Sequence, residues 1–266
     1  MIYKQSSSTL KEEKYPLSKN ANRSNIISVE TPFDNATAKI SIIIPTLNES
    51  KNIKATLAST QKSTNIEIIV VDGGSEDNTV DIAQSPGVKV IKSCKNRAYQ
   101  MNTGAMNATG DILLFLHADT LLPANFDEMI RIGLQQPKTV AGAFSLRINA
   151  PQTGLRLVEW GVKFRSKWLQ MPYGDQGIFI TKKIFNDIGG FPELPIMEDF
   201  ELIRNLKRLG KITLIPVPVI TSPRRWLKKG VWQTTLINQI VIIAYFLGVS
   251  PKIIRSWYRG EKLIKH

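Results

Sequence analysis

The stretch GDILLFLHADT, at residues 110–120, decides how this chain folds. Its apolar run, residues 112–116, is too short for a helix and has the unbroken hydrophobicity of a strand covered on both faces. The run ends abruptly in His117, Ala118 and Asp119. Open α/β sheets bind ligands at the carboxyl ends of such strands, so we interpret Asp119 as a carboxylate that meets a metal and phosphate groups. The alternative is an ordinary turn, with Asp119 capping a helix after Pro123.

Composition sets the size and class of the protein. The chain has 266 residues, 42% of them hydrophobic, which is enough for one large domain or two small ones. Segments of strand and helix character alternate, and this favours a single α/β domain. The one cysteine, Cys94, excludes an internal disulfide and fits a reducing cytosol. With His117 and His266 as the only histidines, a histidine-rich metal site is excluded.

Positive charge is concentrated near the C-terminus. The whole chain carries 35 Lys and Arg against 22 Asp and Glu, a net charge of +13, and residues 221–266 hold nine bases and a single acid. Such a basic end favours an anionic partner, either lipid headgroups or a phosphorylated substrate. Nucleic acid is disfavoured, because zinc-finger spacing, an RNP-like run and a basic heptad helix are all missing. A solvated basic tail is the alternative.

The chain divides into three parts. Residues 1–38 are polar and lack periodicity, so we expect a disordered tail without a signal-peptide core. Residues 39–226 carry the alternating strands and helices. Residues 227–266 form a basic, partly apolar helical segment whose apolar block, residues 240–247, is short of the roughly 20 residues that span a bilayer. We therefore expect a cytoplasmic protein, with this segment packed on the domain or lying at the cytoplasmic membrane face.

Two strand–turn–helix units open the ordered part. Residues 39–44 are an apolar strand ended by Pro45, and Asn48 or Ser50 is a candidate cap for the helix that follows. Residues 65–71 are a second strand, and Ser75 is a candidate cap for the next helix. Two such units form half of a mononucleotide-binding sheet. The glycine spacing matches neither a dinucleotide fingerprint nor a P-loop, so NAD and P-loop ATP chemistry are rejected.

Three later segments carry further signals. Residues 154–168 are aromatic on one side and basic on the other, which suits an acceptor wall, a membrane-facing helix or an ordinary amphipathic helix. A helix starts near Glu198, and its predicted apolar stripe, Leu202, Leu206 and Leu209, has Asp199 on the same side. An acid on an inward stripe is unusual, although it can also be a simple cap. Residues 212–220 read as an edge strand, because prolines interrupt them.

Together these motifs resemble the family 2 glycosyltransferases, whose GT-A fold is a Rossmann-like mixed α/β sheet flanked by helices. The resemblance covers residues 39–226. The motifs that carry it are, in chain order, IIIPTLNE (42–49), VVDGGSEDNT (70–79), GDILLFLHADT (110–120), GGF (189–191), MEDFEL (197–202) and RRW (224–226). The LHADT variant and the C-terminal tail look like a bacterial subgroup tied to arsenosugar biosynthesis, and the chain more distantly resembles a carotenoid-acid glycosyltransferase.

The resemblance implies how a nucleotide-sugar donor binds. Pro45, Thr46 and Glu49 are expected to line the nucleotide pocket. Asp72 is expected to form a hydrogen bond with the nucleotide base, which we expect to be uracil. Ser75 is expected to lie near this base.

The resemblance also implies a divalent cation at the phosphate end of the donor. Arg97, at the start of a helix over residues 96–108, is placed to reach a phosphate. Asp119 corresponds to the metal-binding member of the family's Asp-x-Asp element, and His117 replaces its first aspartate. A neutral imidazole ligates Mn²⁺ but suits Mg²⁺ poorly, so both Mn²⁺ and Mg²⁺ remain open.

Catalysis and the acceptor are assigned to later residues. Asp199 is expected to be the catalytic base, with Glu198 and Asp175 on the acceptor side. Residues expected near the diphosphate or the acceptor channel are Arg224, Arg225 and Trp226. A base that takes the acceptor proton, with a cation that neutralises the departing diphosphate, needs only one displacement, which inverts the anomeric carbon.

The sequence therefore predicts an inverting glycosyltransferase that moves a sugar from a UDP-sugar or similar donor to a small-molecule or lipid-linked acceptor. The enzyme alternative is a nucleotidyltransferase, but residues 45–49, PTLNE, are not the Gly-rich basic loop that such enzymes usually need. The non-enzyme alternative is a degenerate nucleotide-sugar-binding or membrane scaffold protein, which the histidine at position 117 suggests.

Overall fold

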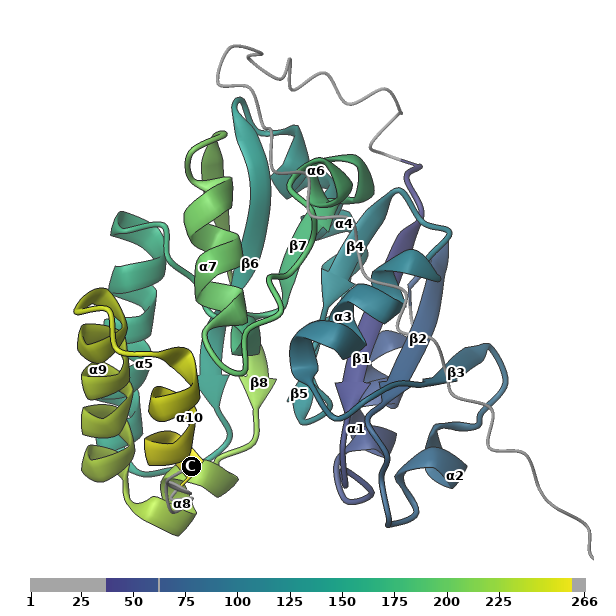
Figure 1. Ribbon diagram of the computed structural model, residues 1–266. Helices are drawn as coiled ribbons and strands as arrows, with labels where there is room; N and C mark the ends of the chain where they lie inside the picture. Colours follow the sequence, from purple (N-terminus) through teal and green to yellow (C-terminus); the bar gives the residue numbers. More distant parts are fainter. Residues whose placement is uncertain (1–36, 62, 260–266) are drawn as a thin grey trace, which may run out of the picture.

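The computed structural model describes residues 37–61 and 63–259, so the predicted disordered tail lies almost wholly outside the described residues. One mixed sheet of eight strands runs through the molecule in the order β3-β2-β1-β4-β7-β6-β8-β5 (Figure 1). The strands are β1 (Ile40–Thr46), β2 (Ile66–Asp72), β3 (Val88–Lys92), β4 (Ile112–Phe115), β5 (Thr120–Leu121), β6 (Thr139–Ile148), β7 (Ile178–Thr181) and β8 (Lys211–Thr221).

Helices cover both faces of this sheet. They are α1 (Ile53–Thr60), α2 (Thr79–Ala83), α3 (Arg97–Met106), α4 (Phe126–Gln135), α5 (Thr153–Trp168), α6 (Lys182–Asp187), α7 (Glu198–Leu206), α8 (Arg224–Lys229), α9 (Val231–Phe246) and α10 (Pro251–Arg259), with a 3₁₀ turn, η1 (Gly174–Gln176). Helices α1, α2, α4, α5 and α8 contribute to one hydrophobic cluster, and α3, α6 and α7 to the other.

The unbroken apolar runs become strands because each face meets a layer of helices. In β1, Ile42 and Ile44 point into one cluster, while Ile43 points into the other. In β4, Leu114 joins the first cluster and Leu113 the second, and both are fully buried. The mixed α/β sheet flanked by helices that the sequence predicts is confirmed.

Strand directions bring the polar ends of the strands to one edge. Strands β1, β2, β3 and β4 are parallel, and the register pairs Thr46 with Asp72 at the ends of β1 and β2. Strand β7 is antiparallel to both β4 and β6. Strand β8 pairs with β6 along its length and with β5 only at Ile220 and Thr221, so its other edge is largely open, as its prolines predict.

Several local predictions are wrong. Helix α1 follows Asn52, while Asn48 takes a left-handed backbone with φ 55°, so neither Asn48 nor Ser50 caps it. Helix α2 follows Asn78, because Ser75 is instead bonded to Asp72. Leu209 is 39% exposed, since α7 ends before it.

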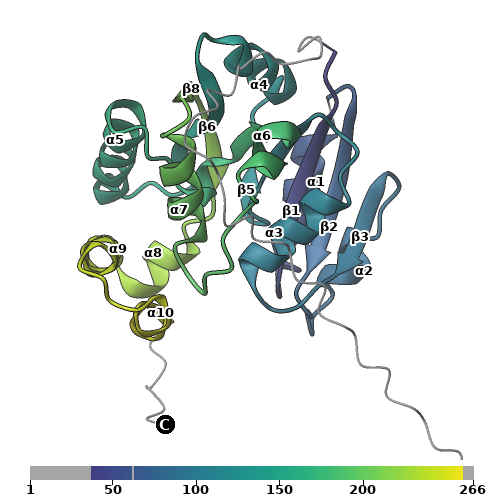
Figure 2. The ribbon, with the colours of Figure 1, turned by 45° about the horizontal axis from the view of Figure 1, so that its top comes forward.

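The C-terminal helices complete the molecule on the side away from β3 (Figures 1 and 2). Val241 and Ala244 of α9 and Ile254 of α10 pack with Met197 and Phe200 at the start of α7, in a third cluster. Within the described part of the chain, every helix is too short or too polar to cross a bilayer.

A close helix–sheet contact predicts a stability effect. A Cβ atom at Gly104 of α3 would lie 2.3 Å from Ile43 Cγ2 of β1 and 3.2 Å from Val71 Cγ2 of β2. We expect Gly104→Ala to lower the free energy of unfolding by about 1–3 kcal/mol, because it overpacks a rigid contact. Urea denaturation measures this.

Gly161→Ala is the matched control, because this glycine lies in α5 and a Cβ atom there would have no neighbour within 4 Å. Alanine has the higher helix propensity, so this variant should gain about 0.5–1 kcal/mol. Equal effects of the two substitutions would contradict the packing of α3 described above.

Candidate active site

A pocket of about 440 Å³ opens at the carboxyl ends of the central strands. Its walls come from the segments that follow β1, β4 and β8, from the starts of α3 and α7, from η1, and from α9 and α10. Segments that are far apart in the chain meet here because parallel strands end at the same edge of the sheet.

Most of the predicted site residues lie in this one pocket. Its lining includes Pro45, Thr46, Glu49, Arg97, His117, Asp119, Asp175, Asp199, Arg224, Arg225 and Trp226. Three other predicted residues, Asp72, Ser75 and Glu198, are outside the lining and lie behind it. The pocket thus unites Asp119 with Asp199, which are 80 positions apart in the sequence.

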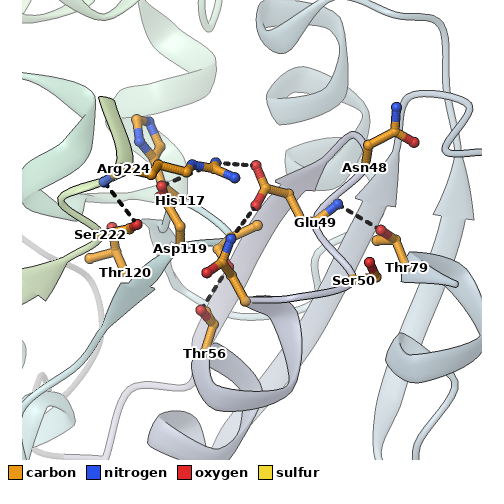
Figure 3. A network of polar contacts seen from close by, with 12 residues as sticks. Asn48, Glu49, Ser50, Thr56, Thr79, His117, Asp119, Thr120, Ser222 and Arg224 are labelled. Carbon is orange, nitrogen blue, oxygen red and sulfur yellow. Dashed lines mark hydrogen bonds and ion pairs between the residues drawn. The ribbon is translucent and has the colours of Figure 1, made fainter. Parts of the chain in front are cut away.

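Arg224 joins two carboxylates that line the pocket (Figure 3). Its Nη2 atom lies 3.1 Å from Asp119 Oδ2 and also forms an ion pair with Glu49 Oε1. The hydrogen bond to Glu49 is the main reason why the pKa of Arg224 is raised. The segments after β1, β4 and β8 are therefore held together by one guanidinium group.

Asp119 is largely buried, and Arg224 only partly offsets the effect of burial on its carboxyl group. Burial raises the pKa of its carboxyl group, Arg224 lowers it, and the neighbouring charge of Glu49 raises it again. The expected alternative role as a helix cap is wrong, since α4 begins only at Phe126, after Asn125. A cation or a hydrogen-bond donor on a ligand would stabilise the ionised form.

Gly174 lies between Asp199 and His117. A Cβ atom on this glycine would be 3.1 Å from both Asp199 Oδ2 and His117 Nε2, and the glycine's own N–H donates to Asp199 Oδ2 at 2.7 Å. The other oxygen, Oδ1, accepts from the N–H of Phe200 at 2.8 Å. Two backbone donors thus orient the Asp199 carboxylate at the N-terminus of α7, where the helix dipole favours an anion.

His117 is neutral at physiological pH. Burial and the positive charge of Arg97 lower the pKa of its imidazole to about 3, and the carboxylate of Asp199 opposes them only in part. Its Nε2 atom lies 3.5 Å from Arg97 Nη1. The imidazole is therefore an uncharged group in the pocket, next to Arg97 and Arg224, which are potential phosphate partners.

Arg97 is anchored from behind by Glu198, which is 2% exposed. Burial lowers the pKa of Arg97, but the carboxylates of Glu198 and Asp199 outweigh it and keep the guanidinium charged. Because the Arg97 side chain is still 43% exposed, it presents positive charge to the pocket.

Asp175 has an unsatisfied oxygen in the pocket. Its neighbour Gln176 is fully buried and locks η1, since its amide bonds to Phe144 O at 2.9 Å and to Ser166 Oγ at 3.0 Å. The Oδ1 atom of Asp175 is buried without a hydrogen-bond partner among the described residues. Burial raises the pKa of this carboxyl group to about 6, although Arg165 acts against it.

Asp72 is buried behind the pocket with all its acceptor positions in use. It accepts hydrogen bonds from the N–H groups of Gly74 and Ser75, and from the hydroxyls of Ser75 and Thr46. A carboxylate offers about four lone-pair positions. A nucleotide base can bond to Asp72 only by replacing one of these donors, and the Ser75 hydroxyl is the most easily rotated.

Several pocket residues were not predicted from the sequence. Gln100 ties β1 to β2 by donating to Thr46 O and Val71 O, both at 2.8 Å, and its place inside α3 offered no motif. Tyr173 stacks under Arg165, whose Cζ lies 3.4 Å from the ring centroid. Pocket residues contributed by the C-terminal helices are Asn238, Val241, Ile242 and Tyr258. Only the proximity of the RRW motif to this segment could have suggested them.

The metal expected from the sequence can be tested against these side chains. Within residues 37–61 and 63–259, no group of three or more His, Cys, Asp and Glu side chains is arranged to hold an ion. Asp119 is a largely buried carboxylate in the pocket lining, with Arg224 at one of its oxygens. This arrangement fits a cation that takes most of its ligands from a bound diphosphate, as Mg²⁺ commonly does.

The fold is of the GT-A type with a pocket at the strand ends, and comparison with known proteins shows which family the chain belongs to. The model of Glycosyl transferase family 2 matches residues 41–191, so the chain belongs to this family. The predicted family is thereby confirmed, while the arsenosugar subgroup stays a prediction.

Curated relatives agree with this assignment. The chain is 34% identical to 4,4'-diaponeurosporenoate glycosyltransferase of Staphylococcus haemolyticus over 111 residues, 38% of this chain and 30% of that protein. This match confirms the expected likeness to a carotenoid-acid glycosyltransferase. The chain is also 35% identical to a PGL/p-HBAD biosynthesis glycosyltransferase of Mycobacterium bovis over 172 residues, 59% of this chain and 64% of that protein. The chain thus spans less than two thirds of these relatives.

Solved structures share the fold. The mannosyltransferase PcManGT of Pyrobaculum calidifontis, in complex with GDP-Man and Mn²⁺, is 19% identical with a TM-score of 0.57, over 72% of this chain and 57% of that one. TarS of S. aureus in complex with UDP-GlcNAc is also 19% identical with a TM-score of 0.57, over 69% of this chain and 58% of that one. At this identity the likeness establishes the GT-A architecture.

The raised pKa of Asp175 predicts a pH-dependent cost in stability. Between about pH 4 and pH 6 the folded protein keeps a proton that the unfolded chain has lost, so unfolding becomes easier as the pH rises through this window. Asn cannot ionise. We therefore expect Asp175→Asn to stabilise the protein at pH 8 by ~1–2 kcal/mol, after allowance for solvent screening, and much less at pH 4.

Urea denaturation of both proteins at the two pH values measures this difference. Asp81→Asn, at an exposed position in α2, controls for the loss of one negative charge. An Asp175→Asn protein that is less stable than the wild type at pH 8 would contradict the burial of an unpaired carboxylate.

Proposed function

We propose that this glycosyltransferase moves a sugar from a UDP-sugar to an acceptor hydroxyl with inversion at the anomeric carbon. One observation carries the proposal: Asp119 and Asp199 line the same pocket, together with His117. A donor held at Asp119 would present its anomeric carbon toward Asp199. The acceptor would then approach from the opposite side to the leaving diphosphate.

The nucleotide is proposed to bind against the ends of β1 and β2. Pro45, Thr46 and Glu49 line this end of the pocket. Uracil has an N–H group that could replace the Ser75 hydroxyl as a hydrogen-bond donor to Asp72. The base and the Asp72 carboxylate would then satisfy each other. The solved relatives named above carry UDP-GlcNAc and GDP-Man, which supports a nucleotide-sugar and leaves the base to experiment.

A divalent cation, Mn²⁺ or Mg²⁺, is proposed to bind between Asp119 and the donor diphosphate. Bound there, it would supply positive charge to the diphosphate leaving group. Arg224 lies 3.1 Å from Asp119 Oδ2, so a cation bound through the other oxygen of this carboxylate would leave Arg224 next to the phosphates. The neutral imidazole of His117 is a further potential ligand, and it favours Mn²⁺.

Asp199 is proposed to act as the base. As the acceptor oxygen forms its bond to the anomeric carbon, the bond from that carbon to the diphosphate breaks and the hydroxyl proton moves to Asp199. UDP leaves with the electron pair. Arg97, fixed by Glu198, lies where it can stabilise the negative charge on the diphosphate. No covalent intermediate is required, because Asp199 acts on the acceptor and not on the sugar.

Asp175 is proposed to recognise a sugar or acceptor hydroxyl. Its buried Oδ1 needs a donor, and its negative charge would repel phosphate. Arg225 and Trp226, on the same wall as Arg224, would contact the diphosphate or the acceptor. The small-molecule or lipid-linked nature of the acceptor, the cytoplasmic location and the attraction of the basic C-terminal segment to anionic membranes stay predictions.

The two alternatives predict different products. A nucleotidyltransferase would release pyrophosphate from a nucleoside triphosphate, and a scaffold protein would bind nucleotide without turnover. We expect slow release of UDP from a UDP-sugar in the presence of Mn²⁺, because water can replace the acceptor. A screen of UDP- and GDP-sugars for nucleotide release measures this, with EDTA as the control. Tight nucleotide binding without release from any donor would favour the scaffold.

The proposed base is tested by Asp199→Asn. Transfer should fall by about 10²–10⁴-fold, since the acceptor loses its base. Affinity for UDP, measured by calorimetry, should change by less than about threefold, because the proposed base acts on the acceptor and not on the nucleotide.

Glu201→Gln is the control in the same first turn of α7. Its carboxylate bonds to Tyr245 at 2.6 Å, outside the pocket lining, so activity should stay within a few-fold of the wild type. An equal loss of UDP affinity and transfer in Asp199→Asn would assign this residue to donor binding instead.

A further inference from the structure

Helix α5 turns a stripe of large apolar side chains toward solvent. The four members recur at helical spacing and are 49–69% exposed: Leu157 (58%), Trp160 (69%), Phe164 (49%) and Trp168 (69%). The opposite side of α5 supplies Leu155, Val158 and Val162 to the hydrophobic core. A surface helix normally directs polar side chains outward. The apolar stripe on the solvent side of α5 is therefore not explained by packing against the core.

Helix α9 repeats this pattern. Its outward residues, again at helical spacing, are Trp232 (66%), Leu236 (61%), Ile240 (47%) and Ile243 (58%). Val241 and Ala244 point the other way and pack against the start of α7. Gln233 and Gln239 are the exposed polar residues beside this stripe, so the solvent side of α9 is mostly but not wholly apolar.

The two helices are neighbours at the end of the molecule farthest from β3, as the two ribbon views agree (Figures 1 and 2). A Cβ atom on Gly154, at the start of α5, would lie 3.3 Å from Val231 Cγ1 and 3.8 Å from Trp232 Cζ2 of α9. We call the eight side chains of the two stripes the α5–α9 face. Large exposed apolar side chains gathered on two neighbouring helices indicate a binding partner.

Positive charge accompanies this face. Lys163 and Lys167 are exposed on α5 between its aromatic residues, while Lys228 and Lys252 flank the two ends of α9. Residues 221–259 contain no Asp or Glu. The only acid of α5, Glu159, accepts from Ile148 N at 2.6 Å and pairs with Arg156, so it is largely neutralised.

We propose that the α5–α9 face docks onto an anionic lipid bilayer and lies in its interfacial layer. Tryptophan is the side chain that prefers this layer, and three of the eight residues are tryptophans. Lysines beside them can extend to anionic headgroups while their alkyl stems stay among the lipids. A second copy of the chain is a poorer occupant, because two such faces would bring lysines against lysines.

The docked face is connected to the pocket. Phe246, one turn beyond Ile243 and 65% exposed, packs edge-on against Phe200 with ring centroids 5.5 Å apart, and Phe200 lines the pocket. Val241 and Ile242 of the same helix also line it. Docking would thus place an apolar pocket wall next to the bilayer, which favours a lipid-linked acceptor; this consequence rests on the proposed function, whereas docking itself does not.

The decisive experiment compares two matched substitutions in the full chain. Ile240→Asp alters the face, and Ile132→Asp alters α4, where the isoleucine is 51% exposed. Both add one negative charge. In flotation assays with vesicles of equal phosphatidylcholine and phosphatidylglycerol, Ile240→Asp should weaken binding about tenfold or more relative to Ile132→Asp, because it loses an inserted isoleucine. Trp160→Gln should weaken it similarly, since α5 belongs to the same face.

A depth measurement complements the affinity. Brominated phosphatidylcholine should quench the tryptophan emission of the wild type, and replacing Trp160, Trp168 and Trp232 by Phe should remove most of this quenching. Equal vesicle binding by Ile240→Asp and Ile132→Asp overturns the proposal. So does a wild type that ignores vesicles but forms a dimer in light scattering that Ile240→Asp dissociates.

Nucleotide release without lipid separates this proposal from the function proposed above. Ile240 lies outside the pocket lining, so Ile240→Asp should keep the wild-type rate of UDP release. Absence of release from the wild type would count against the proposed donor chemistry and leave the vesicle result intact.

Discussion

The ion pairs of Arg224 with Glu49 and Asp119 link three segments that line the pocket. Each partner follows a different strand, β8, β1 and β4, and each strand is held in place by the sheet. Because both faces of the central strands are covered by helices, charged side chains can lie only beyond the strand ends. There they need one another, since an enclosed carboxylate without a partner is costly. The pocket with its charged side chains therefore lies at the strand ends, which the helices do not cover.

The same constraint explains the division of labour among the acids. Asp72 accepts hydrogen bonds from the turn that follows β2, and Glu198 forms an ion pair with Arg97. Asp119, Asp175 and Asp199 face the pocket. Of these, Asp199 is oriented by two backbone N–H groups, while Asp175 keeps an oxygen without a partner in the part of the chain that is described. Structural acids and ligand-facing acids are thus distinguished by what already satisfies them.

The C-terminal helices contribute to the pocket as well as to the surface. Helix α9 gives Val241 and Ile242 to the pocket lining and Ile240 and Ile243 to the exposed stripe. An α-helix presents consecutive residues to different directions, so one segment can serve both. The domain boundary predicted after residue 226 stays a prediction, but in the structure the residues on either side of it share the same pocket.

The sequence by itself determined the alternating α/β architecture, the family and the strand ends at which charge collects. These follow from local patterns: apolar runs such as residues 112–116 can only be buried strands, and the motifs after them carry the family resemblance. Only the tertiary structure decided the helix starts near Asn52 and Asn78, the pairing of Arg224 with Asp119, and the inclusion of Gln100 and Tyr258 in the pocket. Those depend on contacts between segments distant in the chain, whose energies leave no trace in the local pattern of residues.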